Sequence, residues 1–339
     1  MEALGSPPNI GAFSKLESHK RTAQRVRKAV SGIANAPGSL ASIKTESILS
    51  ANGRPFVVFD SGREDPERII LFGDRSHIQK LKDHPHWAAD GTFKSAPKLF
   101  LQILTVHFFY SCTFKGKVLN KAIPAVFAIL PNKYQRTYRR VWEAIRELLN
   151  DPLFTPTSFI ADFEKAIRKS YLAVFPGSNV AGCLFHLMQC IMKRVKRLKM
   201  GSEFNRSENI RKFVKFLGAL AFVPVANVET AFGEIRQLLG DSGLLDETPS
   251  MRSLYFYFQK NFIGSRDEFG VQTQPRYQPA QWNQFDRVRN RLPRSDAPLE
   301  GFHFGIQASL GVHPQFYSFA EKLKVKCFCI SNMFNKLFL

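Results

Sequence analysis

The feature of this chain that most limits its fold is a run of three consecutive β-type segments near its middle. They read HWAADGTF (86–93), KLFLQILTVHFFY (98–110) and KAIPAVFAILP (121–131), and each is closed by glycine, lysine-rich or Pro-Asn punctuation. Strands that follow one another across short turns predict an antiparallel meander. A chain of 339 residues, 44% of them hydrophobic, is long enough to bury such a sheet in one sizeable core.

Helix-type and strand-type patterns alternate after the meander. Apolar residues recur at intervals of three and four over 133–151, which is the spacing of one helix face. The segments that follow are a strand over 158–163, a helix over 164–175, a strand over 178–186 and a basic helix over 186–200. This order predicts an α/β fold with a mixed sheet and flanking helices, as in ribonuclease H-like domains.

The rest of the chain divides around this core. Helical patterns dominate from 203 to 290 and predict an all-helical insertion ahead of a last helix. The predicted organisation is a basic N-terminal helix with a linker (1–54), a β-hairpin lead-in (55–85), the core (86–202), the helical insertion (203–290), a C-terminal helix region (291–326) and an atypical tail (327–339).

The charge balance indicates the class of partner. Lys and Arg outnumber Asp and Glu by 48 to 28, which gives a net charge of +20, and this excess favours nucleic acid. Five cysteines are too few for a disulfide framework in a chain of this length, so we expect a reducing compartment. We also expect a soluble protein, because the chain opens without an apolar leader and Gln102 and His107 interrupt its most apolar run.

Two carboxylates share one sequence context. Asp90 follows the apolar run WAA and Asp162 follows FIA, so each comes at the end of a predicted strand. Glu300 shares a face of the last predicted helix with His303. Three carboxylates brought together repel one another unless cations lie between them, and oxygen ligands favour Mg²⁺ or Mn²⁺. Taken singly, each acid is more typical of a turn or of a solvated helix face.

Longer stretches around these acids resemble a known family. WAADGTFKSAPKLFLQILTVHFF, IPAVFAILPNKYQRTYRRVWEAI and FIADFEKAIRKSYLAVFPGSNVAGCLFHLMQCI are similar, in this order, to the transposase domain of Mutator-like DNA transposable elements, the MULE family. The segment WNQFDRVRNRLPRSDAPLEGFHFGIQASLGVHPQFYSFAEKLK resembles the continuation in its animal branch, whose members often carry a FLYWCH-type zinc finger. The resemblance covers roughly residues 20–326.

The resemblance implies a ribonuclease H-like core with a DDE triad of metal-binding acids and a helical insertion before the last acid. Asp90 in DGTFK matches the first acid, Asp162 in ADFEKA the second and Glu300 in LEGFH the third. The chain departs from the family where SDA (295–297) replaces Thr-Asn-Asn ahead of the third acid. No FLYWCH-type Cys/His set precedes the core, and the tail from Lys326 onward differs from the expected continuation.

The family's Cys-x-x-His after the second acid corresponds to Cys183 and His186. Two ligands do not make a structural zinc site, and no spacing brings Cys190 and His303 in to complete one. The alternative, which we favour, is a half-buried cysteine beside a histidine, with His186 and His303 supporting the acids or contacting DNA. The basic helix that follows either binds phosphates or forms only a solvated face. Its cations are Lys193, Arg194, Lys196, Arg197 and Lys199.

These features together predict a nuclear, Mg²⁺-dependent DNA transposase. It would hydrolyse a phosphodiester at each transposon end and join the freed 3′-hydroxyl to target DNA. Its partner would be double-stranded DNA, and it would work as a homo-oligomer. Two alternatives stay open: a domesticated DNA-binding or regulatory protein that keeps the fold without catalysis, and a structure-specific nuclease.

Overall fold

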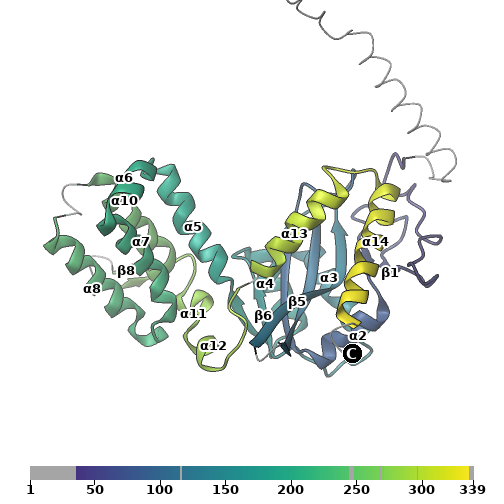
Figure 1. The fold of residues 1–339 in the computed structure, drawn as a ribbon, viewed down its shortest axis with the longest axis horizontal. Coiled ribbons are helices and arrows are strands. Elements are labelled where there is room, and N and C mark those ends of the chain that lie inside the picture. Colours follow the sequence, from purple (N-terminus) through teal and green to yellow (C-terminus); the bar gives the residue numbers. More distant parts are fainter. Residues whose placement is uncertain are drawn as a thin grey trace, which may run out of the picture.

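The computed structural model describes residues 36–114, 117–243, 248–266, 269, 271–295 and 297–335. They form two lobes that lie side by side (Figure 1). We call the part built on the large sheet the sheet lobe and the part from α5 to α12 the helical lobe. The basic N-terminal helix predicted within 1–54 falls on 13–31, outside the described residues.

Seven strands form one mixed sheet in the order β1-β2-β5-β4-β3-β6-β7. β3, β4 and β5 pair antiparallel and make the predicted meander, whereas β6 and β7 extend it in parallel from β3. The α/β class with a mixed sheet and flanking helices is therefore confirmed. The strands are β1 (Val57–Asp60), β2 (Ile70–Phe72), β3 (His86–Thr92), β4 (Gln102–Phe114), β5 (Lys117–Leu130), β6 (Ser158–Ala161) and β7 (Asn179–Gly182).

Helices cover both faces of this sheet. Successive side chains of a strand point to opposite faces, so on β2 Leu71 enters one apolar layer while Ile70 and Phe72 enter the other. Because helices pack on both faces, the strands are apolar along most of their length. The Leu71 layer is closed by α2 (Arg75–Asp83), α3 (Gln135–Leu149) and α4 (Lys165–Val174), and the opposite layer by α13 (Ala297–Leu310) and α14 (Phe316–Asn335).

The helical lobe has a core of its own. α5 starts beside the sheet and turns Leu187, Ile191 and Val195 into a buried cluster that also contains Trp282. In order, the elements are α5 (Leu184–Arg197), α6 (Gly201–Arg206), α7 (Glu208–Ala219), η1 (Leu220–Phe222), η2 (Val225–Asn227), α8 (Val228–Asp241), α10 (Pro249–Phe258), η3 (Gln259–Ile263), β8 (Ser265–Arg266), β9 (Gln272–Thr273), α11 (Pro279–Trp282) and α12 (Phe285–Arg289).

The two lobes meet at the end of β7. The buried Gln284 of the helical lobe donates from Nε2 to the carbonyl of Gly182 at 2.8 Å, while its backbone N–H donates to the carbonyl of Ala221 within its own lobe at 2.6 Å. A Cβ at Gly182 would lie 2.6 Å from the Phe163 ring and 2.9 Å from the Gln281 carbonyl oxygen. Only glycine allows this approach, so the end of β7 is held directly against the helical lobe.

Two predicted segments of the sheet lobe differ from the structure. The lead-in over 55–85 contains α2 as well as the predicted strand pair, and Asp74 caps this helix by accepting the Ser76 N–H at 2.8 Å. The strand predicted over 98–110 begins only at Gln102. The residues before it form a turn in which Leu99 has φ +81°.

One further correction and one further finding concern the later part of the chain. The insertion is not all-helical, because β8 and β9 pair there; strands of two residues give no alternation that a sequence reading could detect. The tail beyond 326 continues α14 to Asn335, since no glycine or proline interrupts 316–335. In the described part of the chain, no helix has the length and apolar character that crossing a membrane requires.

Candidate active site

Asp90 and Asp162, the two acids predicted near strand ends, lie at the same edge of the sheet and on the same face. Ala88 of β3 and Ile160 of β6 are partners in the parallel ladder, and both pack in a small apolar cluster with Leu299 of α13. Asp90 and Asp162 each follow two residues later, so the period of two turns both carboxylates toward the face that α13 covers. Neighbouring parallel strands end at the same edge, which brings the two acids together. We call this place the carboxylate site.

A histidine from α13 contacts the first acid. His303 Nδ1 lies 3.0 Å from Asp90 Oδ2, and both side chains are only 11% exposed. The other ring nitrogen, Nε2, lies 2.8 Å from Thr105 Oγ1 on β4, which in turn lies 3.0 Å from His107 Nε2. Asp90 is therefore the end of a buried polar chain that runs through α13 and back into the sheet.

The two carboxylates have opposite electrostatic environments. Burial acts to raise the pKa of Asp90, but the hydrogen bond and charge of His303, with smaller effects of His186 and the Gly91 N–H, lower it below the ordinary 3.8. Burial raises the pKa of Asp162, and the nearby charges of Glu164 and Asp90 raise it further against the opposing effects of the Glu164 N–H and His186. Of the two acids, Asp162 is the one whose surroundings disfavour the ionised form.

A second network holds the loop that carries Asp162. Asp162 Oδ1 accepts the Glu164 N–H at 2.8 Å. The Glu164 carboxylate accepts the Tyr138 hydroxyl at 2.9 Å and pairs with Lys133 at 2.6 Å. Gln102 donates to the same Tyr138 hydroxyl at 2.6 Å. Burial, together with the charge and hydrogen bond of Glu164, raises the pKa of Tyr138, so this hydroxyl stays protonated.

Glu300 lies in the first turns of α13, between two residues that touch the strand ends. Leu299 packs with Ala88 and Ile160, and His303, one turn further on, contacts Asp90. The backbone at position 300 is thus brought to the carboxylate site, while its side chain lies outside the described residues. Asp296 lies outside the described residues.

The donors fit a divalent cation in kind. Carboxylate oxygens are the ligands that Mg²⁺ and Mn²⁺ prefer, and the repulsion that raises the pKa of Asp162 is what a bound cation would relieve. Among the side chains that the structure describes, no three or more His, Cys, Asp or Glu form a ready metal cluster. That set does not include the Glu300 carboxylate.

The Cys-x-x-His element lies where β7 passes into α5. Cys183 is buried at the helix N-cap, and its Sγ lies 3.8 Å from Ser295 Oγ. His186 lies in the first turn of α5, close enough to influence the pKa of both acids. His303, in contrast, has both ring nitrogens on Asp90 and Thr105. The structure therefore places His303 with the acids and not in a cluster with Cys190.

The basic helix is α5, and only part of its circumference carries exposed cations. The buried stripe of α5 packs into the helical lobe, which leaves Lys193, Lys196 and Arg197 exposed on the other side. Arg194 is partly buried with its guanidinium 5.2 Å from the Tyr257 ring centroid, and Lys199 lies beyond the helix end. α5 and α13 run outward from the junction of the lobes, one on each side of it (Figure 1).

Sequence reasoning missed the polar residues that support the acids. Gln102 and His107 appeared only as interruptions of an apolar strand, yet both are fully buried and belong to the two networks. A polar side chain inside a strand that is otherwise apolar must find a partner, and this was the available signal. Arg168 of α4, also mostly buried and close to Asp162, carried no such signal.

The mixed sheet with flanking helices places this chain in the α/β class. Its two acids lie close to the ends of adjoining strands. Comparison with protein families makes the assignment more specific. Residues 86–190 match the family model of the MULE transposase domain, so this segment is similar to the transposase domain of the Mutator-like elements. The match runs from the first residue of β3 into α5 and includes Asp90, Asp162, Cys183 and His186.

The match confirms the resemblance stated from the sequence and gives the chain a transposase-related function, with DNA as its partner in general. The matched segment ends before the rest of the helical lobe and before α13. A search of curated proteins finds no match.

Proposed function

We propose that this chain is the catalytic domain of a DDE-type DNA transposase built on a ribonuclease H-like core. One observation carries the proposal: Asp90 and Asp162 each follow by two residues a register-paired position on adjoining parallel strands. Their carboxylates therefore share one buried edge. The meander followed by parallel β6 and β7 supports a ribonuclease H-like sheet.

Asp90, Asp162 and Glu300 would hold the metal ions, Mg²⁺ or Mn²⁺. When bound, such ions supply positive charge that stabilises the phosphoryl-transfer transition state and makes water a better nucleophile. The protein's own residues contribute by holding the two aspartates in position. His303 fixes one oxygen of Asp90, and the Glu164 N–H fixes one oxygen of Asp162.

The reaction we propose has two displacements at phosphorus. In the first, a water oxygen bonds to phosphorus at the transposon end while the bond to the 3′-oxygen breaks, and this oxygen leaves as a 3′-hydroxyl. In the second, the hydroxyl attacks a phosphodiester of target DNA and releases a new 3′-hydroxyl. Neither step needs an enzyme-linked intermediate.

Double-stranded DNA is the proposed substrate, and the nucleus is where we propose it is met. The exposed side of α5, with Lys193, Lys196 and Arg197, starts about two turns beyond His186 and can contact phosphates near the carboxylate site. Work on two ends and one target is most simply done by a homo-oligomer, which we propose as the active form.

The test is metal-dependent nicking of supercoiled plasmid DNA by the full chain. We expect nicking with Mg²⁺ or Mn²⁺ that stops with a chelator and falls about 100-fold or more in Asp90→Asn, Asp162→Asn and Glu300→Gln, because each removes a carboxylate that would hold the ions whose positive charge stabilises the transition state. Glu321→Gln is the matched control, since this exposed glutamate of α14 forms an ion pair with Lys324 of the same helix. Undiminished nicking in Asp162→Asn would overturn the proposal.

The alternatives give different results in the same assay. A domesticated protein binds the plasmid without nicking it, in the parent chain as in the variants. A general nuclease cuts DNA with or without matching inverted ends, whereas a transposase joins only cut ends that carry its repeats to a second DNA molecule.

A further inference from the structure

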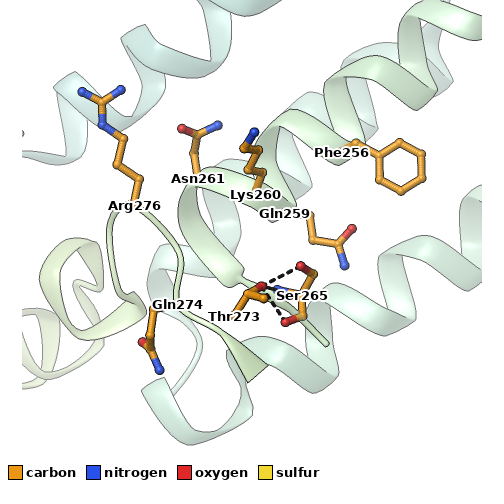
Figure 2. A pocket seen from close by; sticks show the side chains of 8 residues that line it. All are labelled: Phe256, Gln259, Lys260, Asn261, Ser265, Thr273, Gln274 and Arg276. Atoms are coloured by element: carbon orange, nitrogen blue, oxygen red, sulfur yellow. Dashed lines mark hydrogen bonds between the residues drawn. The ribbon is translucent and has the colours of Figure 1, made fainter. Parts of the chain in front are cut away.

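The helical lobe contains an open cavity that the proposed chemistry does not use. Its volume is about 860 Å³, and it lies where η3, the β8–β9 hairpin and the segment leading to α11 meet (Figure 2). This size lies within the range of about 300–1,000 Å³ typical of cavities that hold small molecules.

The walls of this cavity are fixed by backbone geometry. η3 is a π-helical turn, a rare widened turn that is often found at functional sites. It ends at Gly264, which has φ +96° and where a Cβ would lie 2.4 Å from the Thr273 carbonyl oxygen. On either side, the Ser265 N–H donates to Thr273 Oγ1 at 3.1 Å and the Tyr277 N–H donates to the Asn261 carbonyl at 2.8 Å.

The lining side chains have the chemistry of a nucleotide site. Lys260 and Arg276 are exposed cations, and together with Asn261 they point to the same side in Figure 2. Phe256 is 53% exposed at the rim. Of the lining residues that the structure describes, none is acidic. Amides suited to base edges complete the wall, and they are Gln259, Asn261 and Gln274.

The cavity is connected to the carboxylate site through two adjacent residues. The Tyr277 ring centroid lies 4.9 Å from that of Phe163, the residue after Asp162. Arg276, next to Tyr277, is close enough to Cys190 of α5 to influence its pKa, and so is His186. The Arg276 end of the cavity therefore lies on the side of the carboxylate site and α5.

We propose that this cavity binds one or two nucleotides of a single DNA strand that extends from the carboxylate site. The two cations would contact phosphates and Phe256 would stack on a base. Stacking on an exposed aromatic ring requires an unpaired base, because the faces of paired bases are covered by their neighbours. The inference rests on the proposed function for its ligand, and it adds a site outside the segment matched by the family model.

The test is equilibrium binding of a short fluorescein-labelled oligothymidylate, measured by anisotropy over a series of salt concentrations. The chain carries Asp162→Asn and the buffer contains no metal, so no cleavage occurs. Lys260→Ala with Arg276→Ala should weaken binding about tenfold or more and reduce the slope of log affinity against log salt by about 1.4, since each phosphate contact on single strands contributes about 0.7.

Phe256→Ala should weaken binding about tenfold with an unchanged salt slope, and Phe256→Tyr should restore it. The matched control for charge is Lys212→Ala with Lys215→Ala, which removes two exposed cations of α7 that do not line the cavity. Blunt duplex of the same length should be affected no more by the cavity variants than by this control.

Equal losses in the cavity and control variants, or parent-like binding by Phe256→Ala, would overturn the proposal. Melting temperatures of all variants separate lost contacts from lost folding. Because binding is measured without catalysis, failure of the nicking assay leaves this result standing. Nicking by the parent together with unchanged binding in the cavity variants refutes only the cavity.

Discussion

At the scale of single residues, the carboxylate site holds two acids. The surroundings favour the ionised form of one and disfavour that of the other. Asp90 has a partner, His303, that favours its ionised form. Asp162 is buried beside two other carboxylates, which disfavour its ionised form. Binding sites often carry such unfavourable charge because the ligand, and not the fold, compensates it.

Neutral substitutions of these two acids should therefore change stability in opposite directions. At pH 7 and without metal, Asp90→Asn should lower the melting temperature, because the charge that His303 favours is lost. Asp162→Asn should raise it, because the amide oxygen can still accept the Glu164 N–H without the buried charge. Each kcal/mol corresponds to roughly 2 °C in a chain of this size, which differential scanning calorimetry resolves.

The pH dependence follows from the two pKa directions. Asp90, with a lowered pKa, stabilises the fold above its ordinary 3.8, and this contribution is lost as the pH falls through the folded-state pKa. Asp162, with a raised pKa, favours the fold when protonated, and this contribution is lost as the pH rises through its folded-state pKa. Both variants should approach the parent in acid. A pH-independent difference would contradict the assigned electrostatics.

The sequence identified the acids but not their partners, for a physical reason. An Asp after an apolar strand is visible locally, because strand and turn chemistry act over a few residues. The contact between Thr105 and His303 spans 198 residues and depends on how α13 docks. A local sequence pattern does not reveal how a distant helix docks. His303 could therefore be predicted as a site residue only because it lies beside Glu300.

At the scale of elements, one hydroxyl joins three of them. Tyr138 of α3 receives a hydrogen bond from Gln102 of β4 and donates one to Glu164 at the start of α4. The loop that carries Asp162 is thereby tied to the sheet and to the helix behind it.

Removing this hydroxyl should loosen the loop. Tyr138→Phe leaves the buried Gln102 amide without its acceptor and Glu164 with one bond fewer, so we expect a loss of about 1–3 kcal/mol in the free energy of unfolding. Tyr134→Phe is the control at the N-terminus of the same helix, because Tyr134 is exposed. Urea unfolding of both variants measures the difference, and equal midpoints would contradict the role given to the network.

Element boundaries were predictable where periodicity is strong. The helix expected over 133–151 is α3, with its apolar face formed by Tyr138, Val141 and Ile145. α2 was missed because its nine residues begin soon after β2 and bury only three side chains. Short elements are fixed by their neighbours more than by their own pattern.

At the scale of the whole molecule, ligand binding should appear as stability. A cation bound by the folded chain and not by the unfolded chain raises the melting temperature by mass action. We expect Mn²⁺ at about 100 times its dissociation constant to add about 2.7 kcal/mol to the parent, and to add much less to Asp162→Asn. Thermal unfolding with and without Mn²⁺, in buffer that contains no other divalent cation, tests this. An equal rise of the melting temperature in both chains would mean that the ion binds elsewhere.

The contact between Gly182 and Gln284 has a consequence for how the molecule would handle its substrate. With no room for even a methyl group between β7 and the Gln281 carbonyl of the helical lobe, the two lobes cannot hinge at this point without breaking the buried hydrogen bond from the Gln284 side chain to the Gly182 carbonyl. The distance from the acids to any surface on the helical lobe is then constant. A nick made by such a body would always fall the same number of nucleotides from the bases it grips.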